Sequence, residues 1–248
     1  MILKCLIAAA LLAALPAAAK VQVTGELRRW HRVTLTFDGP PTAEDGMPNP
    51  FRDYRLTVTF THAASGMAYP VAGFYAADGN AAETSATAGN KWRVHFTPTA
   101  EGEWRFTASF RAGAEVALDV APAAGKPAAG DGEKGSFRVR ASDKSGNDHR
   151  AHGLLEYTGA HHLRFAGSGK YFLKAGADSP ENFLAYDEFD GTYDSDADSG
   201  SYKQVGPFIH KYGPHVADWR AGDPAWPGGK GKGLIGARKY LAAPGVNS

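Results

Sequence analysis

Residues 91–96 read Lys-Trp-Arg-Val-His-Phe, and the strict alternation of polar and apolar side chains in this stretch decides the fold class. In an extended strand, successive side chains point to opposite faces. Two sets of side chains result, the apolar Trp92, Val94 and Phe96 and the polar Lys91, Arg93 and His95. This pattern is typical of a β-strand that has one buried face and one solvated face.

Three further stretches of the chain repeat this alternation. They are residues 32–37 (RVTLTF), 54–60 (YRLTVTF) and 103–110 (EWRFTASF). Turn signals separate the strands, namely Asp38-Gly-Pro-Pro41, Asn49-Pro50, Asp78-Gly-Asn80 and Glu101-Gly102. Several short strands within about 100 residues predict an all-β, two-sheet sandwich of immunoglobulin-like type over residues 20–120. The sandwich contains no cysteine pair, which excludes a domain of antibody type.

The composition changes after the sandwich. Residues 121–135 (APAAGKPAAGDGEKG) contain almost no apolar bulk, and we predict a flexible linker there. A second unit is predicted over residues 136–248. Its expected short strands are residues 136–140, 153–157 and 162–165, followed by residues 171–175 (YFLKA). The continuous apolar run of the last stretch is typical of a strand that is buried on both faces.

The end of the second unit reads as a long loop followed by a helix. Residues 183–230 are rich in Asp, Gly, Ser and Pro, and we expect an elaborated loop with short helical pieces. Residues 233–242 place Leu234, Ala237 and Leu241 at helical spacing. A strand, a long loop and a helix in this order predict one β/α unit of a parallel α/β fold.

The first 19 residues resemble a secretory signal peptide. Lys4 supplies a positive charge, an apolar run extends from Cys5 to Leu15, and small residues precede Lys20. The run is shorter than the roughly 20 apolar residues of a membrane span, so a membrane anchor is the less favoured alternative. Removal of residues 1–19 would leave a chain without cysteine. We therefore expect a bacterial protein that is secreted or periplasmic.

The overall composition excludes several classes of partner. The formal net charge is +1 over 248 residues, which gives no electrostatic basis for binding nucleic acid or an anionic membrane. Hydrophobic residues make up 43% of the chain, and this proportion favours a packed protein over a disordered one. The sequence makes no prediction of the oligomeric state.

Several stretches of this sequence resemble the sequences of a known protein family. Residues 30–111 are similar to the immunoglobulin-like "domain of unknown function 5060", which stands at the front of bacterial proteins of glycoside hydrolase type. The matching stretches are Trp30, 33–40 (VTLTFDGP), 49–54 (NPFRDY), 73–79 (GFYAADG), 92–98 (WRVHFTP) and 102–104 (GEW). Residues 169–183 (GKYFLKAGADSPENF) and 189–192 (FDGT) resemble the start of the catalytic (β/α)8 barrel, or TIM barrel, of the same proteins.

This resemblance implies the front part of a polysaccharide-directed glycoside hydrolase. Such enzymes work through two carboxylates that flank the scissile bond. The family's carboxylates follow later barrel strands, and residues 136–248 are too few for a complete barrel, which needs about 200–250 residues. The barrel is therefore expected to be truncated. We assign no catalytic residue, no metal and no cofactor to the chain, and we expect it to be inactive alone.

Polar residues follow the predicted first barrel strand. Asp178, Ser179, Glu181 and Asn182 are candidate ligands of a polysaccharide or oligosaccharide substrate, because active sites of this fold lie at the carboxyl ends of strands. The alternative is that Asp178-Ser-Pro-Glu181 caps a short helix, and capping is the favoured interpretation. The two roles can coexist. A paired-carboxylate role for Asp178 and Glu181 is disfavoured, since the two are close together on one loop.

Three other motifs suggest chemistry only weakly. Residues 194–200 (DSDADSG) resemble a calcium loop but lack the EF-hand glycine and glutamate positions, so a solvated acidic loop is favoured. Residues 231–236 (GKGLIG) fit G-x-G-x-x-G without a preceding strand, so a loop that leads into a helix is favoured over a nucleotide site. A zinc site is disfavoured for His149, His152, His161 and His162.

Two functions for the sandwich remain open. It is either an accessory domain of the hydrolase or a non-catalytic module that binds carbohydrate or is purely structural. Trp92 and Trp104 could stack on sugar rings, but their place in alternating strands favours core packing.

Overall fold

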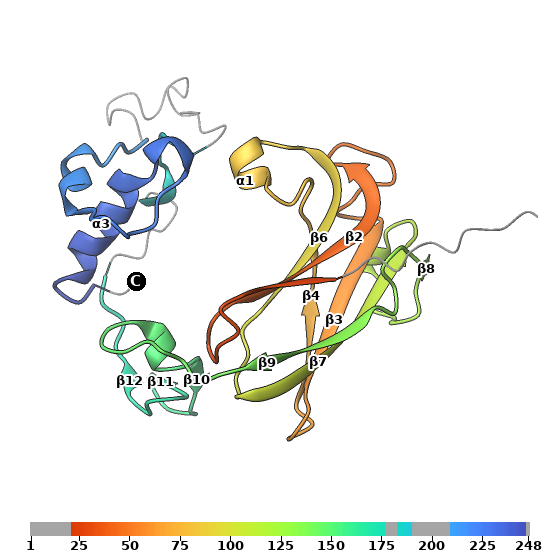
Figure 1. Ribbon diagram of the computed structural model, residues 1–248, viewed down its shortest axis with the longest axis horizontal. Helices are drawn as coiled ribbons and strands as arrows, with labels where there is room; N and C mark the ends of the chain where they lie inside the picture. The colour runs from red at the N-terminus through yellow and green to blue at the C-terminus, as the bar shows by residue number, and fades with distance from the viewer. Residues whose placement is uncertain (1–20, 177–182, 190–208, 247–248) are drawn as a thin grey trace, which may run out of the picture.

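A computed structural model describes residues 21–176, 183–189 and 209–246 of the protein. The predicted signal peptide, residues 1–19, lies outside these ranges. Most of the first range forms two facing antiparallel sheets (Figure 1). The first sheet has the order β1-β2-β6-β5, formed by Gln22–Gly25, Val33–Ala43, Ala88–Phe96 and Phe74–Tyr75. The second sheet has the order β4-β3-β7, formed by Ala68–Ala72, Tyr54–His62 and Gly102–Ala112. Two further strands, β8 (Lys126–Pro127) and β9 (Lys134–Val139), both pair with the other edge of β7.

This strand order is that of an immunoglobulin-like sandwich. The first sheet corresponds to strands A, B, E and D, and the second corresponds to strands C′, C, F and G. The segment after β1 also meets the end of β9 through a parallel bridge between Arg28 and Arg140. There the Arg29 amide donates to the Arg140 carbonyl at 2.8 Å, and the Arg140 amide donates to the Leu27 carbonyl at 3.0 Å. The predicted two-sheet sandwich is confirmed.

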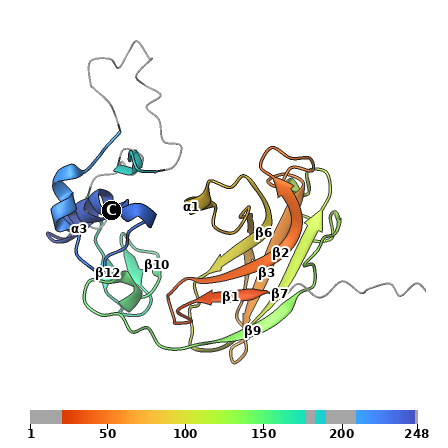
Figure 2. The ribbon, with the colours of Figure 1, turned by 45° about the horizontal axis from the view of Figure 1, so that its top comes forward.

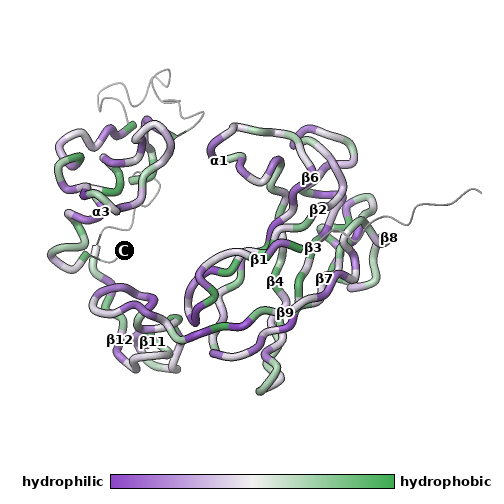
Figure 3. Tube along the Cα trace, viewed as in Figure 1, coloured by the Kyte–Doolittle hydropathy of each residue, from purple (hydrophilic) through white to green (hydrophobic). Residues whose placement is uncertain are grey.

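The core lies between the two sheets and is rich in aromatic rings. Alternation puts every second residue of β2, β3, β6 and β7 into it, as the hydropathy colouring in Figure 3 illustrates. Trp92 and Trp104 are 2% and 0% exposed, which confirms that they are core residues. Phe60 and Phe96 stack across the sheets with ring centroids 4.1 Å apart.

The turn predicted at Asp38–Pro41 is wrong, because β2 continues through these residues to Ala43. The pairing of β2 with β6 shifts register between Asp38 and Thr42, as a β-bulge does. The indole of Trp92 crosses the strand at this point and donates from Nε1 to the Pro40 carbonyl at 3.2 Å. A Cβ on Gly39 would lie 2.5 Å from Trp92 Cδ1, so glycine is needed here for close packing.

The boundary predicted at residues 121–135 also needs correction. Strand β9 pairs with β7 from Lys134 to Val139 and buries Phe137 and Val139 in the sandwich core. The sandwich therefore extends to Val139, and residues 136–139 do not open a second unit. The Ala-rich segment before β9 has no large apolar side chain, but polar bonds to its backbone hold it against the sheet.

A small antiparallel sheet follows the sandwich and is formed by β10 (Leu155–Tyr157), β11 (Leu163–Phe165) and β12 (Tyr171–Phe172). Figure 2 shows the chain reaching this sheet from β9. The strands predicted at 153–157 and 162–165 are present. The buried strand predicted at 171–175 is wrong, since β12 is short and antiparallel and Tyr171 and Leu173 are 60% and 63% exposed. An apolar run alone does not reveal whether a second layer covers it.

The described helices are short except for the last, and Figure 1 shows it in blue. They are α1 (Ala81–Thr84), the 3₁₀ helices η1 (Val116–Leu118), η2 (His149–Ala151), η4 (Gly213–Asp218) and η5 (Pro227–Gly229), and α3 (Lys232–Ala242). Helix α3 confirms the helix predicted at 233–242. Leu234 and Ala237 are buried, whereas Leu241 is 37% exposed. No α/β barrel is formed by the residues that the structure describes. None of the helices in this part of the chain is long and apolar enough to cross a membrane.

Candidate functional site

The residues predicted to contact substrate lie outside the described ranges. Asp178, Ser179, Glu181 and Asn182 belong to the gap between residues 176 and 183, and the acidic stretch 194–200 belongs to the gap between 189 and 209. Their proposed roles therefore stay predictions. The remaining candidate motifs fall on described residues.

The glycine motif at 231–236 forms the start of α3, and its first amide is already occupied. The Gly231 amide donates to Glu188 Oε2 at 2.6 Å, and this bond contributes to lowering the pKa of Glu188 after the larger effect of the Tyr186 hydroxyl. The Trp226 ring lies where a Gly231 Cβ would be, 1.6 Å from Cε3. The 3₁₀ helix η5 precedes the motif in place of a strand. This geometry fits a capped helix start and not a nucleotide site.

The four histidines considered for zinc do not converge in the described structure. His149 and His152 pack their rings against Phe165, and the His162 ring lies 6.3 Å from that of Tyr171. A different histidine lies in a group of potential ligands, because atoms of Glu26, His31 and Asp143 are within 4.8 Å of one another. No sequence motif indicates this group, since Asp143 lies far along the chain from Glu26 and His31.

We call this group and its basic neighbours the junction cluster, defined by Glu26, Arg28, His31, Asp143, Lys144 and Arg150. Lys144 Nζ lies 3.1 Å from Asp143 Oδ1 and 3.5 Å from Glu26 Oε2. An ammonium group thus stands where a metal ion would need to be. Lys144, through a hydrogen bond, is the main cause of a lowered pKa for Asp143. The cluster fits an ion-pair network better than a metal site.

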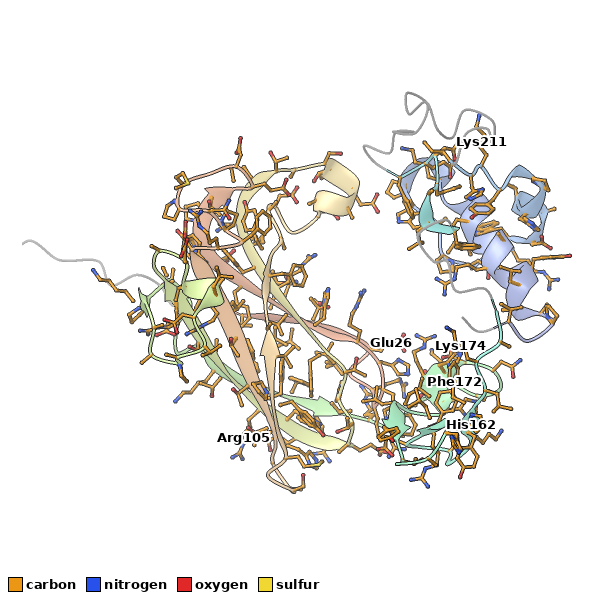
Figure 4. All side chains as sticks on the ribbon, turned by 180° about the vertical axis from the view of Figure 1, so that it is seen from behind. Glu26, Arg105, His162, Phe172, Lys174 and Lys211 are labelled. Atoms are coloured by element: carbon orange, nitrogen blue, oxygen red, sulfur yellow. The ribbon has the colours of Figure 1, made fainter. Side chains whose placement is uncertain are left out.

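The junction cluster joins the sandwich to the segment that follows it. Figure 4 shows Glu26 on the side of the sandwich nearest the small sheet that carries Phe172. His31, which is 2% exposed, places Nε2 3.1 Å from the Ser142 hydroxyl and Nδ1 3.0 Å from Glu26 Oε2. Beside it, Trp30 packs so closely that a Cβ on Gly167 would lie 2.1 Å from its ring. The cluster therefore has a structural role in attaching the two parts.

A cleft at the edge of the sandwich has several aromatic residues in its lining. It has a volume of about 310 Å³ and lies between the start of β3 and the β4–β5 segment. Its aromatic lining consists of Phe51, Tyr54, Phe74, Tyr75 and Trp92. Tyr54 and Tyr75 each contact Trp92, with ring centroids 5.3 Å and 5.2 Å apart. The cleft thus has a floor of packed rings that continues into the core.

Two of these rings lie at the rim and are solvent-exposed. Phe51 is 61% exposed and Phe74 is 42% exposed, whereas Tyr75 is 8% exposed. The Tyr75 hydroxyl is fixed from below, since it donates to the Thr42 carbonyl at 2.5 Å and is 3.2 Å from the Gly89 carbonyl. Burial raises the pKa of this hydroxyl. Exposed rings above a rigid floor can offer apolar faces to a ligand.

Local sequence explains why the cleft forms here. Gly73 separates β4 from β5, and a Cβ on it would lie 2.6 Å from the Leu56 side chain, so the chain passes close to β3 only because this residue is glycine. Phe51 belongs to the turn that Asn49-Pro50 predicts, where the Phe51 amide donates to Asn49 Oδ1 at 3.0 Å. The sequence analysis missed both rim residues, because alternation assigns faces within strands and not at their ends.

Comparison with known proteins finds similarity to one protein family and to a solved structure. Residues 26–111 match the family described as Domain of unknown function (DUF5060), which confirms the resemblance predicted for that part of the chain. No match was found among curated proteins. A solved structure from Bacteroides vulgatus ATCC 8482, described as a "putative glycoside hydrolase", is 28% identical, with a TM-score of 0.37. The match covers 63% of this chain and 25% of that one, so the chain spans about a quarter of that protein's length.

Proposed function

We propose that the sandwich is a carbohydrate-binding accessory domain, and that the whole protein is a secreted glycoside hydrolase directed at polysaccharide. The catalytic unit would be a TIM barrel whose carboxylates lie outside this chain. Asp178, Ser179, Glu181 and Asn182 would contribute contacts to sugar hydroxyls. The family description names no function, so the support for carbohydrate binding comes from the aromatic cleft.

The observation that carries this proposal is the pair of exposed rings at the cleft rim. Phe51 and Phe74 flank a cleft of about 310 Å³, which is in the range of small-ligand sites. The faces of aromatic rings carry partial negative charge and attract the C–H groups on the apolar faces of pyranose rings. A second hollow, of about 340 Å³ along β7 and β9, has a single aromatic residue in its lining, Phe106, and that residue is buried.

Affinity electrophoresis of the full chain through gels that contain a panel of polysaccharides tests the proposal. We expect retarded migration in at least one gel. The double variant Phe51→Ala/Phe74→Ala should migrate there as in a sugar-free gel, because both stacking faces are gone. Tyr157→Ala is the matched control, since Tyr157 is 77% exposed and does not line the cleft.

Two results would contradict the proposal. Unchanged mobility in every gel would favour a purely structural module, which predicts no sugar affinity. Equal retardation of the wild type and the double variant would mean that sugar binds somewhere other than the cleft. Thermal melting of each variant checks that the exposed positions were changed without loss of the fold.

A further inference from the structure

Among the described residues that line the aromatic cleft, one is charged, and it is Arg55. It lies on β3, one residue after Tyr54, which contributes a ring to the cleft floor. None of the ion pairs between described residues includes Arg55. The cleft therefore contains a positive charge without a carboxylate partner.

The hydrogen bonds of the Arg55 guanidinium leave its charge unbalanced. It donates to three backbone carbonyls, those of Asp119, Ala121 (2.9 Å) and Pro122 (3.2 Å). Carbonyl oxygens are neutral acceptors, so these bonds fix the position of the group without neutralising it. A guanidinium has five N–H donors, and the three bonds leave two of them for a ligand.

Nearby carboxylates bind other groups and form no ion pair with Arg55 in the part of the chain that the structure describes. Its cross-strand neighbour Arg111 is also a cation, but Arg111 is paired with Asp131 at 3.5 Å. Asp53, two residues before Arg55, is occupied by Arg52 at 3.1 Å and by the amides of Asn49 and Glu115. The Asp119 carboxylate accepts from the Ala121 amide at 2.8 Å. Arg55 is thus a fixed cation in the lining that it shares with Phe51 and Phe74.

We infer that the cleft binds an anionic saccharide, with Phe51 and Phe74 against the sugar faces and Arg55 against a sugar carboxylate. This inference rests on the proposed function and names its ligand class. The two N–H groups that remain can each donate a charge-assisted hydrogen bond to a carboxylate. Single-stranded nucleic acid also stacks on aromatic residues, but it requires a basic groove along its phosphates. One arginine in a chain of net charge +1 suits a ligand that presents one carboxylate to the cleft.

The test compares polymers that differ only in charge. The full chain is run by affinity electrophoresis in gels that contain polygalacturonate or alginate, and in gels that contain the same polymers after reduction of their carboxylates to hydroxymethyl groups. Neutral glucan and galactan gels complete the set. We expect retardation by at least one uronate polymer and roughly tenfold weaker binding after carboxyl reduction, as loss of one charge-assisted hydrogen bond predicts.

Three arginine variants separate charge from structure. Arg55→Gln removes the charge, and Arg55→Lys keeps the charge but lacks the fork that holds the three carbonyls. Arg105→Gln makes the same change of net charge on β7, outside the cleft, at a residue labelled in Figure 4. We expect Arg55→Gln to lose about tenfold in affinity for the uronate polymer. Arg55→Lys should lose less, and Arg105→Gln should bind like the wild type.

The outcomes distinguish the two proposals. Equal binding to carboxylated and reduced polymers, lost in Phe51→Ala/Phe74→Ala, would overturn the anionic ligand and leave the carbohydrate site standing. Equal losses of affinity in Arg55→Gln and Arg55→Lys would mean that Arg55 acts only on the fold. Equal losses of affinity in Arg55→Gln and Arg105→Gln would mean that the polymer binds through the net charge of the protein and not through Arg55. Either result overturns the inference. Absence of binding in all gels contradicts both proposals.

Discussion

Asp53 fixes the start of β3 to two neighbouring loops. Its carboxylate accepts hydrogen bonds from the Asn49 amide at 2.8 Å, the Glu115 amide at 2.9 Å and Arg52 Nε at 3.1 Å. The residue is 5% exposed. These bonds, with that of Arg52 the largest cause, lower the pKa of Asp53 to about 2. The ionised form is therefore favoured more strongly in the folded chain than in the unfolded chain.

We predict that Asp53→Asn lowers the melting temperature at pH 7 by roughly 5 °C, because an amide cannot accept all three bonds. The pKa is lowered on folding, so the stabilisation is complete above the unfolded pKa of about 4 and is lost as the pH falls toward 2. Melting curves of both proteins between pH 7 and pH 2.5 should converge at the acidic end. A difference that stays constant over this range would show that the charge of Asp53 is unimportant.

The positions of Gly39, Phe51 and Phe74 could not be predicted from local sequence patterns. The residues Asp38-Gly-Pro-Pro41 are typical of a turn, yet β2 continues through them. Glycine is needed at position 39 because the Trp92 indole leaves no room for a side chain. That constraint comes from a residue far away in the sequence. Phe51 lies in a turn and Phe74 begins the two-residue β5, and alternation along a long strand predicts the side-chain direction of neither. The burial of Trp92 and Trp104, in contrast, followed from alternation alone.

At the scale of elements, two arginines hold the segment between η1 and β9. Arg55 binds the carbonyls of Asp119, Ala121 and Pro122, and Arg111 binds those of Ala123, Ala124 and Gly125. Composition made this segment resemble a free linker, because it has almost no large apolar side chain to bury. Backbone carbonyls are present whatever the side chains are, so composition could not reveal this attachment.

We predict that Arg111→Met loosens this segment. The variant loses the three carbonyl bonds and the ion pair with Asp131, at a cost of about 2 kcal/mol in the free energy of unfolding. Hydrogen exchange measured by mass spectrometry should be roughly tenfold faster over residues 119–128. Arg105→Met, at an exposed arginine of the same strand, is the control and should leave exchange there unchanged. Slow exchange in Arg111→Met would mean that other contacts hold the segment.

Alternation predicted the four long strands because each has one face in the core and one in solvent. The sequence predicts a strand at 136–140 but assigns it to the second unit, because a sequence pattern does not show that β9 pairs with β7. The four-residue β1 and the two-residue β5, β8 and β12 are too short for periodicity to reveal. Helix α3 was predictable because Leu234 and Ala237 repeat at helical spacing.

At the scale of the whole molecule, the sandwich has a complete core of its own. Every residue of the core cluster, including the partly buried ones, lies between Val21 and Val139. We predict that residues 21–140 alone unfold cooperatively in urea, as followed by tryptophan fluorescence. A chain that ends at residue 120 loses β9, which leaves one edge of β7 unpaired and removes Phe137 from the core beside Phe60. That shorter chain should show no cooperative transition, and equal midpoints for the two would contradict the corrected boundary.

The part of the molecule after the sandwich was harder to predict, because a local sequence pattern does not show whether another layer of secondary structure covers a strand. The apolar run at 171–175 fits a buried parallel strand, but in the described structure it borders a small antiparallel sheet and remains exposed. The candidate site was unpredictable for a similar reason. Its lining comes from the β3 start, the β4–β5 segment and β6, which meet only in the folded chain.

The parallel bridge between Arg28 and Arg140 has a mechanical consequence. The segment after β1 and the end of β9 run side by side and in the same direction, joined by the bonds from Arg29 to Arg140 and from Arg140 to Leu27. A force that pulls the chain after β9 away from the sandwich, along the direction of β9, loads these two bonds together in shear. The bridge would thus act as a clamp at the point where the chain leaves the sandwich.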